Sequence, residues 1–465
     1  MQVADASLVF AIALGVGVII QALGRHLRVP GIVLLLAAGV ALGPDGLKWV
    51  DPRLLGEGLI GLVRLSVAII LFEGGLNLEI SRLRREGTAI RRLVTLGAII
   101  TGLGGALAAR FFMLDWNWTQ ALLFGSIVIV TGPTVVTPIL RHVRLLPRVS
   151  TVLEAEGVLI DPIGAFIAVL ALEIAVAPSA SAFTNVPLWL AQRIGFGLVA
   201  GASFGFLLAW VLRSRRIVPE GYENIVTMGG VVLLFAVCRS ILPESGILAT
   251  TIAGIVVGNL HTRVGRGMAT FEEQITVMLI GLLFVLLAAS VRLADVQALG
   301  WGGIATVASL MFIVRPVQVF SMTAGTDMSF RDKVFISWLA PRGIVAAAVA
   351  SLTSSVMEVE GIAGGPALRA LVFLTIAVTV LLQGGAAPLV AKMLRLLAPP
   401  RDAAVILGAD GLGLAIGNEL RSAGTRVIFL DTNAANCNAA ERLGYGVVFG
   451  NAFDEKVLAR APRPG

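Results

Sequence analysis

The 465-residue chain is 57% hydrophobic and only 14% charged, and its mean hydropathy is +0.91. These values exclude an ordinary soluble globular protein and are typical of a chain that crosses a membrane many times. The formal charge of +7 does not indicate nucleic-acid binding, because the basic residues occur in short clusters between apolar stretches. The two cysteines, Cys238 and Cys437, are too few for a disulfide framework or a metal cluster.

Thirteen apolar stretches are long enough, or nearly so, to cross about 30 Å of hydrocarbon, which takes roughly 20 helical residues. They predict an all-α polytopic membrane protein with about thirteen transmembrane helices surrounded by lipid. The first stretch lacks a basic segment before it and a small-residue cleavage site after it, so we interpret it as a retained span. The stretches are 6–23, 30–43, 56–78, 88–110, 119–140, 150–175, 187–212, 221–240, 244–260, 270–290, 298–322, 330–353 and 366–395.

The basic residues between the stretches predict the orientation of the chain. With the N-terminus outside, the inward loops carry 17 Lys and Arg residues and the outward loops carry 6, which agrees with the positive-inside rule. The C-terminal part is then cytoplasmic. The six outward residues are Lys48, Arg53, Arg110, Arg239, Arg292 and Arg369.

Two charged residues stand out in the third stretch. Glu73 lies near its cytoplasmic end, where it either lines an inner funnel or reaches lipid headgroups as an ordinary helix-end charge. Both interpretations stay open. Arg64 lies deeper in the same stretch, and the sequence assigns it no partner.

The fifth and twelfth stretches each contain a helix-breaking segment. In the fifth, Pro133 and Pro138 remove backbone donors and Gly132 loosens the helix. In the twelfth, Ala-Pro-Arg-Gly at 340–343 places a cation at the break. Each break alone could be an ordinary kink of a membrane helix. The twelfth stretch comes seven spans after the fifth, and this odd offset turns one segment upside down relative to the other. The pair therefore predicts an inverted repeat with a transport site built from discontinuous helices.

Asp161 lies near the middle of the sixth stretch, where a carboxylate is costly unless it binds a cation or a proton. Thr131 and Thr134 of the first break offer hydroxyl oxygens beside it, and Arg342 of the second break can offset the carbonyl ends of the half-helices. The sequence therefore predicts an ion site at Asp161, where the transported Na⁺ or K⁺ is the only metal expected.

Two further acids precede Asp161 in the sixth stretch. Glu154 lies two helical turns before Asp161, so the two residues share a face and predict a polar path from the inner surface. The alternative for Glu154 is an interfacial charge near the loop. Glu156 points elsewhere and needs a buried partner, for which Arg315 of the eleventh stretch is the candidate.

After Pro399 and Pro400 the pattern changes to alternating strands and helices. Residues 403–407 and 426–431 predict buried strands on either side of a helix at 412–423, and a third short strand follows at 446–449. We therefore predict a partial Rossmann-like α/β domain over 402–465, shorter than the roughly 100 residues of an independent domain.

A glycine-rich segment opens the first helix of this domain. Gly408 and Gly413 follow the first strand, and Asp431 ends the next strand, as a dinucleotide-binding motif requires. Asp410, however, stands where the backbone should approach a phosphate, and its charge opposes one. Two interpretations stay open: the domain binds a regulatory nucleotide, or it is a folded scaffold that aids dimerisation.

The chain resembles the cation/proton antiporter superfamily, and most closely the bacterial sodium/proton exchangers of the monovalent cation:proton antiporter-1 type. The C-terminal part resembles the nucleotide-binding domains that regulate potassium conductance. The membrane resemblance follows the family's order over residues 1 to 395. The stretches that carry it are 71–76, 131–134, 154–164, 244–249 and 340–345.

This resemblance implies a homodimer in the bacterial plasma membrane, built from thirteen helices in two inverted repeats. A core would move against a dimerisation part to alternate access. It also implies that Asp161 binds cation and proton in turn, that Glu156 and Arg315 form a structural ion pair, and that Arg342 belongs to the second break. The implied membrane domain is 1–397, with its core at about 88–175 and 298–395 and its dimerisation part at about 1–80 and 187–290.

Two departures from the family pattern bear on the reaction. Ile160 stands where this branch has Asn and the electrogenic branch a second Asp, and Gly132 stands where many members have Asp. A single central carboxylate predicts electroneutral exchange of one cation, Na⁺, for one proton, in the service of pH homeostasis. Such a secondary active transporter is no enzyme and requires no cofactor.

Three alternatives remain. A K⁺/H⁺ antiporter regulated by a nucleotide is the main one, because domains like the C-terminal one accompany potassium systems. A nucleotide-gated potassium channel is more remote, because no repeated filter sequence such as Thr-Val-Gly-Tyr-Gly occurs among the spans. A signalling receptor would leave a buried acid beside a helix break without a use.

Overall fold

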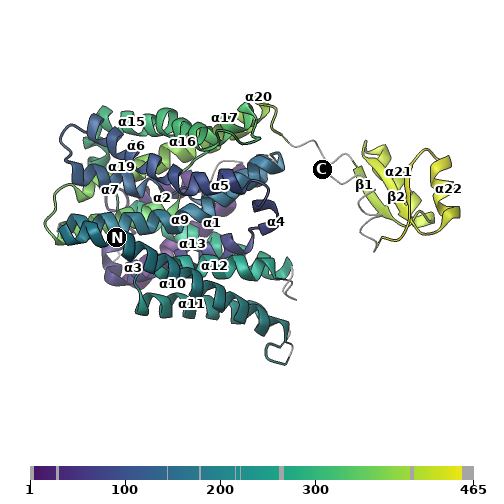
Figure 1. Ribbon diagram of the computed structural model, residues 1–465, viewed down its shortest axis with the longest axis horizontal. Helices are drawn as coiled ribbons and strands as arrows, with labels where there is room; N and C mark the ends of the chain where they lie inside the picture. Colours follow the sequence, from purple (N-terminus) through teal and green to yellow (C-terminus); the bar gives the residue numbers. More distant parts are fainter. Residues whose placement is uncertain are drawn as a thin grey trace. The chain divides into compact units, whose positions relative to one another are not determined.

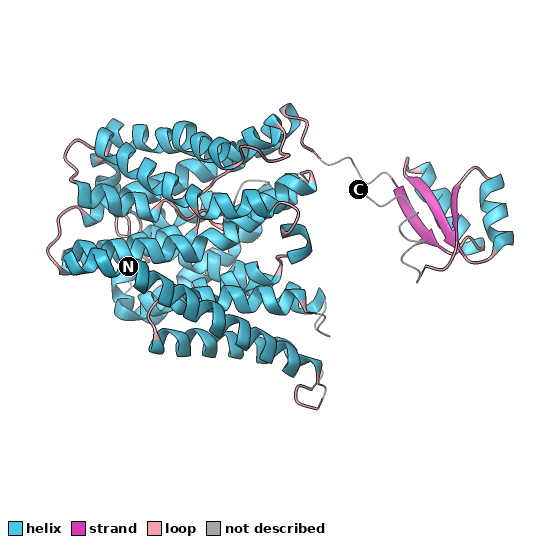
Figure 2. Cartoon of the chain, viewed as in Figure 1, coloured by secondary structure: helices cyan, strands magenta, loops and turns pink. Residues whose placement is uncertain are grey.

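The computed structural model describes residues 5–27, 31–143, 145–176, 180–214, 216–219, 221–260, 266–397 and 403–452. Residues 1–4 of the predicted membrane domain, and 402 and 453–465 of the predicted C-terminal domain, lie outside the described residues. The chain divides into two compact units, Met1–Leu396 and Leu397–Gly465, and each is described by itself. The first unit consists of helices, and the strands belong to the second (Figures 1 and 2).

Within the described residues, each of the thirteen predicted stretches coincides with one helix or with helices in series. Nine helical spans there are long and apolar enough to cross a membrane, and three shorter apolar helices join them. The predicted polytopic all-α fold is confirmed for this unit. The helices that follow single stretches are α1 (Ala6–Leu27), α2 (Gly31–Leu42), α3 (Gly56–Leu76), α9 (Pro147–Val176), α10 (Ala180–Arg213), α11 (Glu223–Ile241), α12 (Ser245–Asn259) and α13 (Arg266–Ala289).

Other stretches form helices in series. The fourth is α5 (Gly87–Val94) and α6 (Leu96–Phe112). The eleventh and thirteenth each contain a π-helical turn: α15 (Gly300–Ser309), η2 (Leu310–Val314) and α16 (Arg315–Met322), and α19 (Gly365–Thr379), η3 (Val380–Gly384) and α20 (Gly385–Met393). Short helices η1 (Pro52–Leu55), α4 (Ile80–Leu83) and α14 (Leu293–Ala298) lie in connections.

The fifth and twelfth stretches are broken in the middle. The fifth forms α7 (Trp118–Ile127) and α8 (Pro133–Val143), and the twelfth forms α17 (Phe330–Trp338) and α18 (Ile344–Val359). Pro133 begins α8 because a first-turn residue needs no amide hydrogen. The two breaks cross at Gly132 and Gly343, where a Cβ atom on either residue would lie 2.5 Å from the Cα atom of the other.

The two broken segments run in opposite directions through the unit. The amide of Leu146, just after α8, donates to the carbonyl of Leu396. The side chain of Arg148 donates to the carbonyl of Asp327, just before α17, over 2.7 Å. The end of α8 and the start of α17 therefore lie on the side where the first unit ends, which we call the C-terminal side. Helix α7 enters from the opposite side, as an inverted repeat requires.

Glycines let membrane helices pack backbone against backbone. A Cβ atom on Gly254 of α12 would lie 2.2 Å from the carbonyl oxygen of Phe72 in α3. One turn on, a Cβ atom on Gly258 would lie 2.1 Å from the carbonyl oxygen of Leu76. Helices α3 and α12 thus form one closely packed wall.

The second unit is a three-stranded parallel sheet in the order β1 (Ala403–Leu407), β2 (Arg426–Asp431), β3 (Gly446–Phe449), connected by α21 (Gly411–Ser422) and α22 (Ala434–Arg442). Val405 pairs with Ile428, and Leu430 with Val448. Phe429 of the central strand is fully buried and meets the Tyr445 ring edge to face. The predicted βαβαβ arrangement is confirmed over the described residues.

Replacing Gly254 by Ala should destabilise the membrane unit by about 1–3 kcal/mol, because the added methyl group overlaps the α3 backbone. Gly61→Ala in α3 is the matched control: no atom lies within 4 Å of its Cβ position. Alanine there should be neutral or stabilising by about 0.5–1 kcal/mol. Thermal unfolding of the detergent-solubilised protein measures both changes, and equal melting temperatures for the two variants would contradict the packing described.

Candidate functional site

Helix α9 carries a buried carboxylate without a donor. Asp161 is 0% exposed, and neither of its oxygens has a hydrogen-bond partner among the described residues. Pro162, the next residue, lies inside the helix and removes the amide that would bond to the Val158 carbonyl. An ionised carboxylate at this position has lost its water and gained no hydrogen bond, so it strongly favours any cation or proton that reaches it.

Asp161 faces the first helix break. Gly157 and Gly164 let α9 approach that break: their Cβ positions lie 3.3 Å from the Pro133 Cα atom and 3.3 Å from the Val130 amide nitrogen. Asp161 is four residues after the first glycine and three before the second, so all three share one face of α9. The carboxylate is therefore directed toward the non-helical backbone between α7 and α8.

The hydroxyl groups of Thr131 and Thr134 lie at the same break. Both residues are buried, at 4% and 7% exposure, and neither Oγ1 atom has a hydrogen-bond partner among the described residues. Thr134 Oγ1 lies 3.2 Å from the Cβ position of Gly132, at the crossing of the two breaks. The structure thus places two unpaired hydroxyl oxygens where the sequence expects ligands.

Arg342 fills the second break and reaches back to the first. Its guanidinium donates to the carbonyls of Val130 and Ile129, over 3.1 and 3.4 Å. These carbonyls follow the end of α7, where a helix has unpaired acceptors and a negative dipole end. The backbone amide of Arg342 donates to Thr379 Oγ1 over 3.2 Å. The Arg342 guanidinium therefore contacts the carbonyls beyond the C-terminal end of α7, where the sequence predicts a compensating charge.

The structure also brings Glu156 and Arg315 together. Arg315 Nη2 donates to Glu156 Oε2 over 2.8 Å, and its Nη1 donates to Oε1 and to Gln318. Both residues are almost fully buried. This two-pronged geometry satisfies the carboxylate, so Glu156, unlike Asp161, is not available to a passing ion.

Glu73, Glu154 and Thr134 line a cavity of about 220 Å³ next to the α8 end of the break. The side-chain amide of Asn77 donates to Glu73 over 2.7 Å. Glu154 lies near the start of α9, so the cavity lies on the C-terminal side of Asp161. The funnel interpretation of Glu73 and the polar-path interpretation of Glu154 fit this placement.

The sequence did not single out several residues at these positions. Glu273 and Thr276 of α13 also line the cavity, and the adjacent Glu272 is 1% exposed. Gln383 in the π-helical turn η3 accepts a hydrogen bond from the Ala340 amide over 3.1 Å and so holds the second break. A π-turn frequently marks a functional position, but no sequence pattern predicts one.

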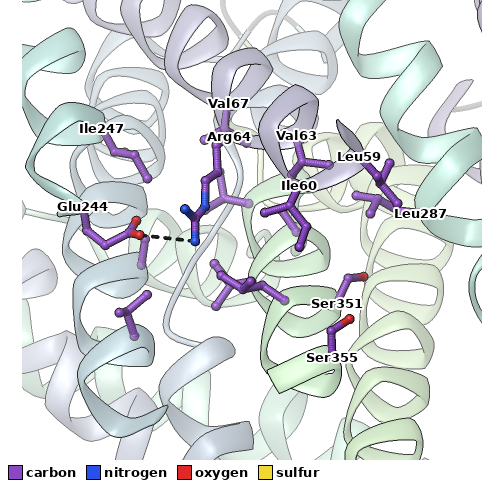
Figure 3. Close-up of a pocket in the computed structure, with 16 residues that line it drawn as sticks. Leu59, Ile60, Val63, Arg64, Val67, Glu244, Ile247, Leu287, Ser351 and Ser355 are labelled. Atoms are coloured by element: carbon purple, nitrogen blue, oxygen red, sulfur yellow. Dashed lines mark ion pairs between the residues drawn. The ribbon is translucent and has the colours of Figure 1, made fainter. Parts of the chain in front are cut away.

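Figure 3 shows a second cavity, of about 80 Å³. Ala165 and Val169 of α9 line it, as do Val345 and Ser351 of α18. Arg64, which had no partner in the sequence, lies 3.6 Å from Glu244 here. Val158 lines the first cavity and Ala165 the second, so Asp161 is placed between the two and lines neither.

Among the described residues, no group of three or more His, Cys, Asp or Glu side chains is placed to hold a metal ion. The side-chain oxygens at the break that Asp161 faces include the hydroxyl groups of Thr131 and Thr134. Such a weak oxygen site suits an ion that must leave again rather than a resident metal.

In the C-terminal unit, the glycine-rich segment satisfies its own amides. Asp410 accepts a hydrogen bond from the Gly413 amide over 2.9 Å at the start of α21. Asp431 accepts from the Ala409 and Asn433 amides, each over 2.8 Å. The Ala409 amide lowers the pKa of Asp431 most, followed by the Asn433 amide. Because Asp410 holds the helix-terminal amide that a nucleotide phosphate would use, the residues present do not fit a phosphate there.

Comparisons with known proteins agree with this architecture. A family model described as "Sodium/hydrogen exchanger, transmembrane" matches residues 10–393, and a TrkA-N domain model matches residues 404–462. The solved structure of the sodium proton antiporter MjNhaP1 from Methanocaldococcus jannaschii at pH 8 is similar, with a TM-score of 0.73 and 25% identity. The match covers 84% of this chain and 98% of that one.

Two curated relatives are similar in sequence. The K(+)/H(+) antiporter NhaP2 of Shewanella sp. (strain ANA-3) is 29% identical over 400 residues, which covers 85% of this chain and 68% of the relative. The Na(+)/H(+) antiporter 1 of Methanocaldococcus jannaschii is 28% identical over 357 residues, which covers 73% of this chain and 81% of the relative.

Replacing Glu156 by Gln should destabilise the protein by about 3–5 kcal/mol, because it leaves the Arg315 charge buried without its partner. Glu86→Gln is the control: Glu86 lies 2.9 Å from Arg148, whose side chain is 38% exposed. Loss of that pair should cost about 0.2–1 kcal/mol. Chemical unfolding in detergent measures both, and a similar loss in the two variants would argue against a structural role for the buried pair.

Proposed function

The chain belongs to the sodium/hydrogen exchanger family, and we propose that it is a secondary active antiporter that exchanges Na⁺ for H⁺ at Asp161. A multi-pass membrane fold and the antiporter relatives support this assignment. The chain works in the bacterial plasma membrane, with the N-terminus outside and the C-terminal unit in the cytoplasm. The uneven distribution of Lys and Arg between the loops supports this orientation.

One observation carries the proposal: Asp161 is fully buried without a hydrogen-bond donor and is placed between two cavities on opposite sides. A carboxylate in this environment is stable when it holds a proton or a cation, and costly when it holds neither. The two ligands therefore compete. Reorientation of the empty, charged form is slow, because it moves a bare charge through the barrier, and this couples the two ion flows.

The charge balance around Asp161 supports exchange of one cation for one proton. Arg315 and Arg342 supply two positive charges in this buried region. Glu156 and ionised Asp161 supply two negative charges that balance them. When Asp161 takes up either H⁺ or Na⁺, the site gains one positive charge in both cases. The same charge then crosses in each direction, and the cycle is electroneutral.

We assign Thr131 and Thr134 as oxygen ligands of the cation. Glu73 and Glu154 attract the cation into the cavity that they line, which we call the inner cavity. The unpaired, buried Oγ1 atoms of the two threonines support the first assignment. Acidic side chains raise the local concentration of cations in a cleft, which supports the second. Glu156, Arg315 and Arg342 serve as structural charges.

For the conformational change, we propose a core at about 88–175 and 298–395, which carries both helix breaks. It moves against a dimerisation part at about 1–80 and 187–290 in a homodimer. The close glycine packing of α3 against α12 supports a rigid dimerisation part. We call the cavity that Arg64 and Glu244 line the outer cavity. The inner and outer cavities lie along the boundary between the core and the dimerisation part, since each is lined by residues of both parts.

A K⁺/H⁺ antiporter is the second candidate, because the Shewanella relative carries that name and the C-terminal unit matches the TrkA-N model. Nucleotide regulation through Gly408, Gly413 and Asp431 would belong to this candidate. The hydrogen bond from the Gly413 amide to Asp410 speaks against a bound phosphate. We therefore favour a scaffold role for the unit. Proteoliposomes with a pH-sensitive dye, titrated separately with Na⁺, K⁺ and Li⁺, distinguish the two cations.

Asp161→Asn should abolish exchange of every cation in proteoliposomes, because the amide keeps the shape of the site but binds neither a proton nor a cation strongly. The purified variant should keep the elution volume and thermal stability of the wild type. Asp45→Asn, at an exposed ion pair, is the control and should retain exchange. Exchange by the Asp161 variant at the wild-type rate would refute the assignment of Asp161.

The apparent KM for Na⁺ should rise as the pH falls, because protonated Asp161 cannot take the cation. Where the proton occupies most of the sites, simple competition gives about a tenfold rise per pH unit. The maximal rate at saturating Na⁺ should change less than the KM. Initial rates over a grid of pH and Na⁺ concentration test this, and a pH-independent KM would rule out competition at one site.

A further inference from the structure

The outer cavity contains one pair of opposite charges in otherwise uncharged surroundings. Of the residues that line it, only Arg64 and Glu244 are charged, and most of the others are aliphatic. Arg64 Nη2 lies 3.6 Å from Glu244 Oε1, with the two side chains 22% and 14% exposed. Arg64 Nε is buried and has no hydrogen-bond partner among the described residues. The pair is loose, and it neutralises the cavity without the bonds of a close ion pair.

This cavity is next to the ion site. Ala165 lines it and lies four residues after Asp161, on the same face of α9. Figure 3 shows Arg64 and Glu244 directed toward one another, with Ser351 and Ser355 of α18 elsewhere around the cavity. This cavity would therefore bring a cation that leaves Asp161 away from the C-terminal side close to the Arg64 charge.

The backbone of Glu244 lies in a conformation that is unfavourable for a glutamate. Its φ angle is +67°, in the left-handed region that favours Gly or Asn. It is the N-cap residue of α12, yet its side chain caps no amide of that helix. Glu is thus unfavourable both in a left-handed backbone conformation and as an N-cap residue. Such strain often persists where a side chain has a function. The observed contact of the Glu244 side chain is the one with Arg64.

The pair also belongs to a single wall of the cavity. Arg64 is on α3 and Glu244 precedes α12, and these two helices pack backbone to backbone through Gly254 and Gly258. The opposite wall consists of α9 and α18, which carry Asp161 and the second break. Movement of the core therefore leaves the distance between Arg64 and Glu244 unchanged.

We propose that the cation path on the outer side passes the Arg64–Glu244 pair, and that Glu244 sets the outer cation affinity by cancelling the charge of Arg64. This inference rests on the proposed function and adds a specificity-determining ion pair to it. Without Glu244, the arginine would face the cavity as an uncompensated positive charge and would exclude cations from it. Because the inner cavity has its own acidic residues, the effect is confined to one face of the membrane.

The test compares the two faces of the membrane with Na⁺ as the probe. Right-side-out vesicles expose the outer face to added Na⁺, and inside-out vesicles expose the inner face. Glu244→Gln should raise the apparent KM for Na⁺ at the outer face by about tenfold or more, the usual scale for charge effects in a cleft. The KM at the inner face should stay within about twofold of the wild type.

A charge-balanced double variant separates electrostatics from structure. Arg64→Gln/Glu244→Gln should restore the outer KM to within about threefold of the wild type, because the cavity is neutral again. Asp45→Asn is the matched control: Asp45 lies 2.7 Å from Arg292 outside the cavity residues, and its loss should change neither KM. Glu244→Gly removes the same charge and relieves the left-handed backbone, so it provides a second folded variant that should behave like Glu244→Gln.

Three results would overturn the inference: an equal rise in KM at both faces, an outer KM in the double variant as high as in Glu244→Gln, or a wild-type outer KM in Glu244→Gly. These outcomes are independent of the antiporter assignment, which Asp161→Asn tests by itself. Exchange that survives in Asp161→Asn refutes the assigned ion site. Exchange that is lost there and unaltered in both Glu244 variants refutes only the role of the pair.

Discussion

A carboxylate that is out of water and without a donor is the constraint on which the membrane unit depends. An ionised Asp161 without a bound ion is costly. The surrounding structure therefore has to give ions a route to this carboxylate and has to keep the empty, charged site from reorienting across the membrane. Glu156, which is buried in the same region, is paired with Arg315. Glu272 of α13, next to the cavity that Glu73 and Glu154 line, is also buried, and neither of its oxygens has a hydrogen-bond partner among the described residues. Pairing with Arg315 thus satisfies Glu156, while Asp161 stays unpaired at the helix break, and Asp161 is the acid that we propose binds the transported ion.

The two helix breaks make this arrangement possible. They bring backbone carbonyls and hydroxyl groups to membrane depth, where intact helices would keep those groups occupied. Arg342 stabilises the exposed carbonyls after α7, while Gln383 and Thr379 hold the second break in place. The crossing at Gly132 and Gly343 keeps both breaks next to α9. Polar atoms at the two breaks are thus held both by close backbone packing and by side-chain hydrogen bonds.

Much of this could be predicted from local sequence patterns. Apolar length predicts the thirteen stretches that form helices, and Pro and Gly predict the two breaks. Burial of Glu156 calls for a basic partner, for which the sequence offers Arg315, and the structure pairs the two residues. Contacts between distant segments could not be predicted in this way. Arg64 and Glu244 are 180 residues apart, and only the packing of α3 against α12 brings them together. Likewise, the cap that Asp410 makes depends on the turn it sits in.

The glycine crossing links the residue type at position 132 to the spacing of the backbone. A side chain at position 132 would overlap the Gly343 Cα atom at 2.5 Å, so an additional acid at that position requires the two breaks to move apart. A wider crossing would change the positions of the oxygen atoms around the ion, and the additional acid would change the charge of the site. Ion coupling ratio and coordination geometry are therefore expected to evolve together in chains of this fold, rather than through a single substitution.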